Sequence, residues 1–218
     1  LVQLTGIENV YERSDVDVRR LEGLPETAGI IHGETPPETI AVRENGLKFL
    51  VDIQRGQKTG FYLDQRHNRE QVGALCAGRE VLNCFSYSGG FSVYALANEA
   101  AHVTSIDSSA DALALGRENV RINDLPEEKT DWLEADVFQA LRTFRDQGRK
   151  FDLIVLDPPK FAQTASQAQR AARGYKDINL LAFKLLRPGG ILATFSCSGG
   201  VSADLFQQIV AGAALDAG

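Results

Sequence analysis

The stretch FDLIVLDPPKF at residues 151–161 decides the fold. Phe151 to Leu156 form a largely apolar run of the kind that is buried on both faces of a parallel sheet. The run ends in Asp157-Pro158-Pro159, where two prolines hold the backbone extended and remove amide donors. This rigid segment predicts a shelf for a flat base, with Phe161 available for stacking.

Strand-like and helix-like segments alternate on both sides of this stretch. Further strands are expected at 81–85, 102–107, 132–136 and 191–196, and helices at 91–97, 110–119, 137–147 and 178–186, the last ended by Arg187-Pro188-Gly189-Gly190. Such alternation predicts right-handed crossovers and an open, doubly wound α/β sheet.

The first part of the chain has a different pattern. The turn Asn45-Gly46 is followed by apolar residues at every second position from Leu47 to Ile53, which predicts a β-hairpin. We therefore expect a small, mostly antiparallel β unit at residues 1–57 and a larger α/β domain at residues 58–218.

Composition excludes several classes of protein. The 218 residues are 44% hydrophobic and 24% charged, as in globular domains. Three cysteines without CxxC spacing (Cys76, Cys84, Cys197) exclude a zinc ribbon and a disulfide framework, and they predict a reducing, cytoplasmic location. No apolar run reaches the roughly 18 residues of a membrane helix. The net charge of −6 disfavours a nucleic-acid coat protein but permits a local RNA-binding groove.

Ligands of doubly wound sheets bind beyond the carboxyl ends of the strands. The loop Ser86–Gly90 follows the first strand of the sheet but lacks GxGxxG, which points to a cofactor without a pyrophosphate. Asp107 could accept hydrogen bonds from ribose hydroxyls, and Asp136 from an adenine amino group. Together these features predict S-adenosylmethionine. The alternatives are a plain βα turn, a helix-capping acid beside Ser108, and a solvated acid at position 136.

Cys197 lies among small polar residues at the end of the last strand, in Phe195–Gly200. A thiolate near a lysine or a helix start is a competent nucleophile, although a lone cysteine can also be a packing residue. The segment Lys58–Arg69 mixes basic, aromatic and amide side chains, which suits a lid over a cofactor or an edge that contacts phosphate. An exposed helix start is the alternative for that segment.

Taken together, the chain resembles the class I S-adenosylmethionine-dependent methyltransferases, with their Rossmann-like sheet. More narrowly, it resembles the bacterial large-subunit ribosomal RNA 5-methylcytosine methyltransferases that carry an N-terminal PUA domain. The resemblance implies a PUA domain before residue 1 and an antiparallel strand pair after the last helix, so we expect the chain to be a fragment. It rests on KTGFYLDQRHNR (58–69), VLNCFSYSGGFSVYAL (81–96), SIDSS (105–109), FDLIVLDPPKF (151–161), GYKDINLLAFKLL (174–186) and TFSCSGG (194–200).

The resemblance also implies roles for individual residues. Cys197 would add to carbon 6 of a cytosine whose carbon 5 is methylated, and Asp157 would pair with the ring nitrogen that gains charge or a proton. Lys160, Phe161 and Tyr175 would position the base, which must be unpaired or flipped out of a duplex. The expected cofactor-binding residues are Phe85, Ser86, Tyr87, Ser88, Gly89, Gly90, Asp107, Ser108, Asp136, Val137 and Asp157, with Gln65 and Arg66 closing over them.

Two other functions stay open at this point. Asp-Pro-Pro followed by an aromatic residue also fits an RNA methyltransferase that modifies a nucleobase nitrogen, in guanine or in an exocyclic amine. A non-catalytic module that binds the cofactor or RNA is the second. A nicotinamide dehydrogenase is disfavoured by the missing third glycine. We expect ribosomal RNA as the partner, no metal and no membrane; a homodimer stays open.

Overall fold

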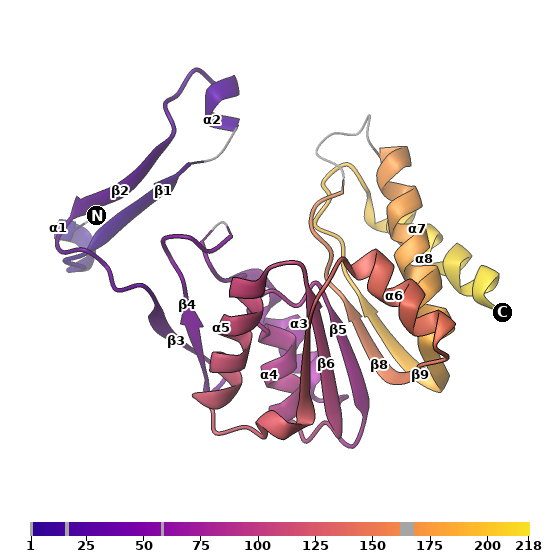
Figure 1. Cartoon of the computed structure of the whole chain (residues 1–218). Helices are drawn as coiled ribbons and strands as arrows, with labels where there is room; N and C mark the ends of the chain where they lie inside the picture. The colour runs from indigo at the N-terminus through magenta and orange to yellow at the C-terminus, as the bar shows by residue number, and fades with distance from the viewer. Residues whose placement is uncertain (1, 16–17, 58, 162–167) are drawn as a thin grey trace.

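A computed structural model of the chain describes residues 2–15, 18–57, 59–161 and 168–218. Its centre is a five-stranded parallel sheet with the strand order β7-β6-β5-β8-β9 (Figure 1). This order, which runs outward in both directions from the first strand, confirms the predicted doubly wound sheet. The strands are β5 (Glu80–Cys84), β6 (His102–Asp107), β7 (Thr130–Glu134), β8 (Phe151–Leu156) and β9 (Leu186–Thr194).

Helices cover both faces of the sheet (Figure 1). The alternation of side chains along β8 divides the core into two clusters. Leu153 and Val155 pack with α3, α4 and α5, whereas Ile154 and Leu156 pack with α6, α7 and α8. The helices are α3 (Arg66–Gly73), α4 (Gly90–Ala97), α5 (Ala110–Arg121), α6 (Val137–Asp146), α7 (Ala168–Leu185) and α8 (Ala203–Ala217), with short turns η1 (Leu63–Gln65) and η2 (Glu127–Lys129).

Two antiparallel hairpins precede the sheet. β3 (Ile40–Glu44) and β4 (Leu47–Val51) pair around Asn45 and Gly46, whose φ angles of 48° and 85° suit a tight two-residue turn. This confirms the hairpin predicted there. The other hairpin, β1 (Val10–Ser14) and β2 (Thr27–His32), extends away from the sheet, with the short helices α1 (Val2–Thr5) and α2 (Val18–Leu21) near its ends (Figure 1).

The β3–β4 hairpin shares a core with the α/β domain. Phe49 is fully buried and lies 5.1 Å from the ring of Phe61. Asn119 on α5 and Asn123 just after the end of this helix hold the outer edge of β4, because Asn119 Oδ1 accepts from the Leu50 N–H (2.7 Å) and Asn123 Oδ1 from the Lys48 N–H (2.8 Å). The hairpin is therefore fixed to the helix layer by packing and by hydrogen bonds from its backbone to these side chains.

The bounds of β7, α7 and β9 differ from the sequence prediction. β7 begins at Thr130 and ends at Glu134, two residues before the expected segment, and α7 begins at Ala168 rather than at 178. Arg187–Gly190 lie inside β9 instead of ending a helix in a loop. Proline is tolerated there because β9 is paired on one side only, and Arg187 is held by Asp152 (2.8 Å) and Glu80.

Across the described ranges, no helix combines the length and the apolar character needed to cross a bilayer. The same residues contain no group of three or more His, Cys, Asp or Glu side chains arranged to hold a metal ion.

Candidate active site

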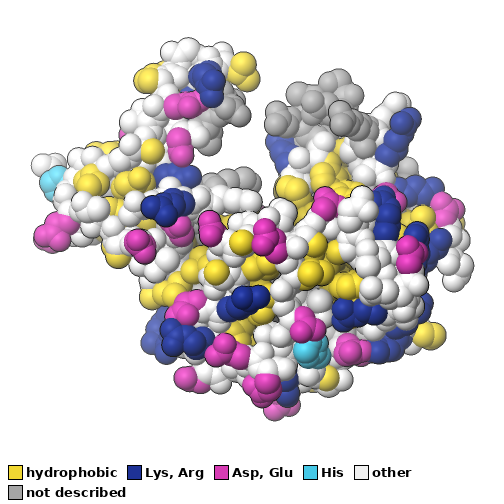
Figure 2. Space-filling view, in the orientation of Figure 1, with side chains coloured by type: hydrophobic (Ala, Val, Ile, Leu, Met, Phe, Trp, Pro, Cys, Tyr) yellow, Lys and Arg dark blue, Asp and Glu magenta, His cyan; other side chains and the backbone are white. Residues whose placement is uncertain are grey.

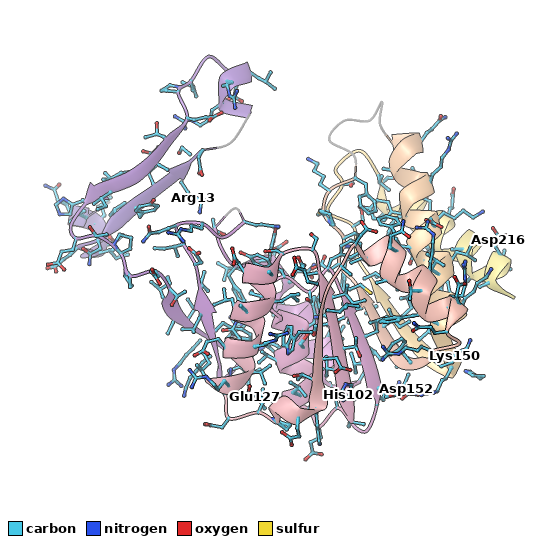
Figure 3. All side chains as sticks on the ribbon, in the orientation of Figure 1. Arg13, His102, Glu127, Lys150, Asp152 and Asp216 are labelled. Carbon is cyan, nitrogen blue, oxygen red and sulfur yellow. The ribbon has the colours of Figure 1, made fainter. Side chains whose placement is uncertain are left out.

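The carboxyl ends of the parallel strands meet at one edge of the sheet. His102 and Asp152, at or near the amino ends of β6 and β8, mark the opposite edge (Figure 3). The predicted residues that follow β5, β6, β8 and β9 are therefore brought to one side of the molecule, as expected for this topology.

The loop after β5 has an unusual backbone. Phe85 and Tyr87 have φ angles of 58° and 47°, a left-handed conformation that costs a non-glycine residue roughly 1–3 kcal/mol. Hydrogen bonds offset this cost: the Ser86 N–H donates to the Ile106 carbonyl (2.9 Å), and the Tyr87 N–H donates to Asp107 (2.8 Å). Strain held in this way is typical of loops that bind ligands.

Asp107 is buried at the end of β6, directly beside this loop. Its Oδ2 accepts from the Tyr87 N–H, and its Oδ1 accepts from the Ser109 N–H at 3.0 Å. A carboxylate has about four acceptor positions. Two therefore stay available for the hydroxyl groups of a ribose.

Gly89 in the loop and Gly116 on α5 both lie against the ring of Trp132. A Cβ atom added to Gly89 would stand 2.8 Å from Trp132 Cη2, and one added to Gly116 would stand 2.5 Å from Trp132 Cζ3. Asn119, fully buried on α5, donates to the Ser88 carbonyl at 3.0 Å. The sequence did not single out Trp132 or Asn119 as site residues, because both are distant in sequence from the loop that they contact.

The acid after β7 has a defined structural role. Asp136 is exposed and caps α6, because its Oδ1 accepts from the Gln139 N–H at 2.9 Å. Val137 is buried in the core below it, and Ser108 is exposed. A helix-capping carboxylate keeps further acceptor positions, so this geometry is compatible with a contact to an adenine amino group.

The two predicted lid residues, Gln65 and Arg66, bind different parts of the structure. Gln65 Nε2 donates to Asp157 Oδ1 at 3.0 Å, so Gln65 is brought to the acid after β8. Arg66 instead donates to Asn45 Oδ1 from Nε (3.2 Å) and Nη2 (2.9 Å), at the turn of the β3–β4 hairpin. In this structure Gln65 faces the site, and Arg66 ties the lid segment to the hairpin.

Cys197 is exposed, and its sulfur lies beside the Asp-Pro-Pro segment. Its Sγ is 3.8 Å from the carbonyl oxygen of Pro158. The other two cysteines are buried: burial raises the pKa of the Cys76 thiol to about 12 and also raises the pKa of Cys84. Cys197 is thus the one thiol of this chain that solvent reaches.

Tyr62 is a site residue that the sequence did not single out. Burial raises the pKa of its hydroxyl, and electrostatic interactions with Tyr87, Asp157 and Cys197 raise this pKa further. Its ring meets that of Tyr87 edge to face at 5.9 Å. Tyr62 therefore contacts the loop after β5 and interacts electrostatically with Asp157 and Cys197.

The three residues expected to position a base differ in exposure. Lys160 is exposed, and Phe161 is half-buried with its ring 4.8 Å from that of Tyr175. Tyr175 is 0% exposed, and its hydroxyl lies 2.9 Å from the hydroxyl oxygens of Ser196 and Ser198. A side chain so enclosed acts through its neighbours.

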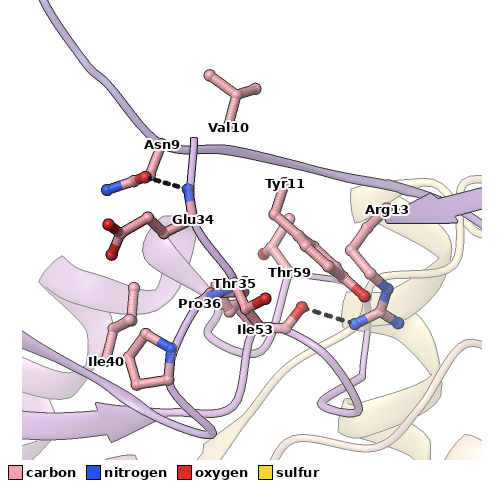
Figure 4. A pocket seen from close by; sticks show the side chains of 11 residues that line it. Asn9, Val10, Tyr11, Arg13, Glu34, Thr35, Pro36, Ile40, Ile53 and Thr59 are labelled. Atoms are coloured by element: carbon pink, nitrogen blue, oxygen red, sulfur yellow. Dashed lines mark hydrogen bonds between the residues drawn. The ribbon is translucent and has the colours of Figure 1, made fainter. Parts of the chain in front are cut away.

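A separate pocket of about 640 Å³ is lined by the start of the β1–β2 hairpin, by residues between Glu34 and Ile40, and by Ile53 and Thr59. Tyr11 and Arg13 line it, and Arg13 Nη1 donates to the Ile53 carbonyl at 3.0 Å (Figure 4). None of the predicted site residues lines this pocket, so it is distinct from the strand-end site.

A doubly wound parallel sheet with a strained loop and a buried carboxylate at the carboxyl ends of its strands is typical of class I methyltransferases. Comparison with known proteins supports this class. A family model for S-adenosylmethionine-dependent methyltransferases matches residues 16–215. The chain belongs to this family.

Individual relatives agree with the assignment. The chain is 57% identical over 210 residues to the ribosomal RNA large subunit methyltransferase I of Aeromonas salmonicida and 55% identical to that of Yersinia pseudotuberculosis, in each case over 96% of this chain and 53% of the relative. It therefore spans about half the length of these curated relatives. SMU.776, whose crystal structure holds SAH, is 27% identical with a TM-score of 0.76, over 84% of this chain and 48% of that chain.

The residues at the strand ends fit S-adenosylmethionine. Asp107 accepts two hydrogen bonds from the protein, and the remaining acceptor positions of its carboxylate suit the hydroxyl groups of the cofactor's ribose. Ser86 Oγ is buried without a hydrogen-bond partner among the described residues. When bound, the cofactor supplies an electrophilic methyl group on a sulfonium centre.

Replacing Asp107 with Asn is expected to raise the Kd for S-adenosylmethionine about 10- to 100-fold. The amide removes the charge, and its NH₂ group cannot accept from the Tyr87 N–H; hydrogen bonds to a charged group contribute about 1.5–3 kcal/mol. Calorimetric titration measures this change. Asp111→Asn, at an exposed acid of α5, is the control and should leave the Kd unchanged. An unchanged Kd for Asp107→Asn would remove Asp107 from the cofactor site.

The single tryptophan should report cofactor binding. Because Trp132 packs against Gly89 in the cofactor loop, filling the site should change the intensity or wavelength of its emission. The expected result is a saturable change on titration with S-adenosylmethionine, with the Kd found by calorimetry. If calorimetry shows that the cofactor binds while the tryptophan emission spectrum stays constant, this placement of the loop is contradicted.

Proposed function

We propose that this chain methylates carbon 5 of a cytosine in large-subunit ribosomal RNA through a covalent adduct with Cys197. The observation that carries the proposal is the exposed thiol at the end of β9, 3.8 Å from the Pro158 carbonyl of the Asp-Pro-Pro segment. The names of the relatives support ribosomal RNA of the large subunit as the substrate.

The chemistry of cytosine explains the need for a thiol. Carbon 5 of the ring is a poor nucleophile. When the thiolate of Cys197 bonds to carbon 6, the electron pair of the 5,6 double bond becomes available at carbon 5, which then attacks the donated methyl group. Loss of the carbon 5 proton to a base restores the double bond and expels the thiolate.

Neighbouring residues stabilise the adduct. Asp157 would pair with the ring nitrogen that gains charge or a proton, and Gln65 holds that carboxylate at 3.0 Å. Lys160, exposed on the same loop, would contact the base or its phosphate. The base has to leave its stack to reach this edge.

The charge distribution favours local contacts with RNA over broad ones. Acidic and basic side chains are interspersed over the face drawn in Figure 2, without a continuous basic surface among the side chains coloured there. A net charge of −6 agrees with recognition through a few site residues.

Nucleoside mass spectrometry tests the proposal against methylation of a nitrogen. Unmethylated large-subunit ribosomal RNA is incubated with the chain and S-adenosylmethionine, then digested to nucleosides. The expected product is 5-methylcytidine. A methyl group on guanine or on an exocyclic amine would overturn the proposal in favour of nitrogen methylation, for which no thiol adduct is required.

A further inference from the structure

Tyr175 lies at the centre of a hydrogen-bonded ring that includes the backbone of Cys197. Its side chain comes from α7 and is fully buried, with the rings of Phe161 and Phe206 packed at 4.8 and 5.2 Å. Its hydroxyl is 2.9 Å from the hydroxyls of both Ser196 and Ser198. These two serines flank the thiol in sequence.

The donors and acceptors of the ring can be assigned. The Ser196 hydroxyl donates to the Tyr175 oxygen, so the Tyr175 proton is free to donate to Ser198 Oγ. Ser198 Oγ also accepts from the Phe161 N–H at 3.0 Å, and the Ser198 N–H donates to Ser196 Oγ at 3.4 Å. The assignment gives the protons of Ser196 and Tyr175 one acceptor each.

This ring determines where the thiol points. Ser196 and Ser198 are both bonded inward to the Tyr175 hydroxyl, whereas Cys197 between them is exposed. The two bonded serines therefore leave the side chain between them on the outer side of the segment.

The ring also joins the two loops that carry the proposed chemistry. Phe161 belongs to the segment that follows β8, and its amide is bonded to Ser198 in the loop after β9. The Sγ of Cys197 approaches the Pro158 carbonyl of the first loop at 3.8 Å. The Tyr175 hydroxyl therefore helps to fix the separation of the thiol from Asp157.

We propose that Tyr175 is a positioning residue, which aims the Cys197 thiol by holding Ser196 and Ser198 and does not itself contact the base. The consequence for methyl transfer rests on the proposed function, in which Cys197 is the nucleophile. The consequence for the thiol itself does not.

Tyr175→Phe removes only the hydroxyl and keeps the packed ring. We expect kcat with large-subunit ribosomal RNA to fall about 10- to 100-fold, because small misplacements of a reacting group have effects of this size. KM for the RNA should stay within about twofold. A raised KM with an unchanged kcat would overturn the proposal, because it would place Tyr175 in contact with the RNA.

Alkylation of Cys197 by iodoacetamide, followed against pH, gives a readout without methyl transfer. The buried Cys76 and Cys84 should not react, so the rate reports one thiol. We expect Tyr175→Phe and Ser198→Ala to change the alkylation rate by at least about threefold or to shift the pH midpoint of the reaction. Both variants should act in the same direction. The control Tyr94→Phe removes a buried hydroxyl bonded to Glu44, far along the chain from Cys197, and should leave the profile unchanged.

A variant that combines Tyr175→Phe with Ser198→Ala shows whether the two residues act together or independently. If Tyr175 acts through Ser198, the losses in kcat of Tyr175→Phe and Ser198→Ala should not add in the double variant. Additive losses, or alkylation profiles identical to the parent chain, would overturn the proposal. If Cys197→Ala kept full activity while the Tyr175→Phe alkylation profile still changed, the proposed function would fail and the positioning role would stand.

Discussion

Replacing Cys197 with Ala is expected to lower kcat for methylation of large-subunit ribosomal RNA by on the order of 10⁴-fold or more. The substitution removes the atom that bonds to carbon 6, and carbon 5 of an unactivated cytosine does not attack the methyl donor at a useful rate. Because Cys197 is exposed and its sulfur makes a long contact with the Pro158 carbonyl, at 3.8 Å, the fold should be unaffected. Single-turnover assays with radiolabelled methyl donor measure the loss.

The matched control is Cys84→Ala, which removes a buried thiol from the core cluster of β5. It should lower stability while leaving kcat per folded molecule nearly unchanged. Calorimetric binding of S-adenosylmethionine to Cys197→Ala should equal that of the parent chain. Full methyl transfer by Cys197→Ala would exclude the covalent route.

The second large effect is on stability. Arg69→Met is expected to lower the free energy of unfolding by about 3–5 kcal/mol, because it leaves the Glu44 carboxylate buried and unpaired. Arg69 donates to both oxygens of Glu44, at 2.8 and 2.7 Å, and both side chains are 4% exposed. Chemical denaturation measures the change, with both proteins fitted to the same dependence of the free energy of unfolding on denaturant concentration.

Two further variants show whether the burial of the ion pair causes the loss of stability expected for Arg69→Met. Arg121→Met breaks an exposed pair with Glu118 on α5 and should cost less than about 1 kcal/mol. Adding Glu44→Leu to Arg69→Met should recover most of the loss, because the unpaired charge is gone. A loss for Arg69→Met as small as that for Arg121→Met would contradict the structural role of the pair.

This ion pair connects the β3–β4 hairpin to the cofactor loop. Arg69 comes from α3, and a Cβ atom added to Gly90 would stand 3.0 Å from its Cδ. Together with Asn119, which bonds both Leu50 in β4 and Ser88 in the loop, it fixes the cofactor loop to the hairpin. Loosening the hairpin should therefore weaken cofactor binding as well as the fold.

Much of the sheet could be predicted because its signals are local. The positions of β6 and β8 were predicted by strand-like runs that end in an acid, and the β3–β4 turn was predicted by Asn45-Gly46. The start of α7 and the path of β9 could not be predicted in the same way. Their determinants are distant in sequence, such as the pairing of Phe151 with Leu186 and the salt bridge between Arg187 and Asp152.

The candidate site was predictable in its position but not in its internal contacts. Asp107, Asp157 and Cys197 follow strands, and topology alone brings strand ends together. The burial of Tyr175 has a sequence signal that was overlooked. Ala171, Tyr175, Ile178, Ala182 and Leu185 recur at i, i+4, i+7, i+11 and i+14, which places Tyr175 on the buried face of one helix.

Covalent trapping tests the central claim most directly. In RNA that contains 5-fluorocytidine, the fluorine at carbon 5 cannot leave as a proton, so the methylated adduct cannot release the enzyme. We predict a complex of chain and RNA that withstands denaturing electrophoresis, requires S-adenosylmethionine and maps to Cys197 by peptide mass spectrometry. Methylation of ordinary RNA by the same preparation, with no such complex or with one that maps to another residue, would contradict the account.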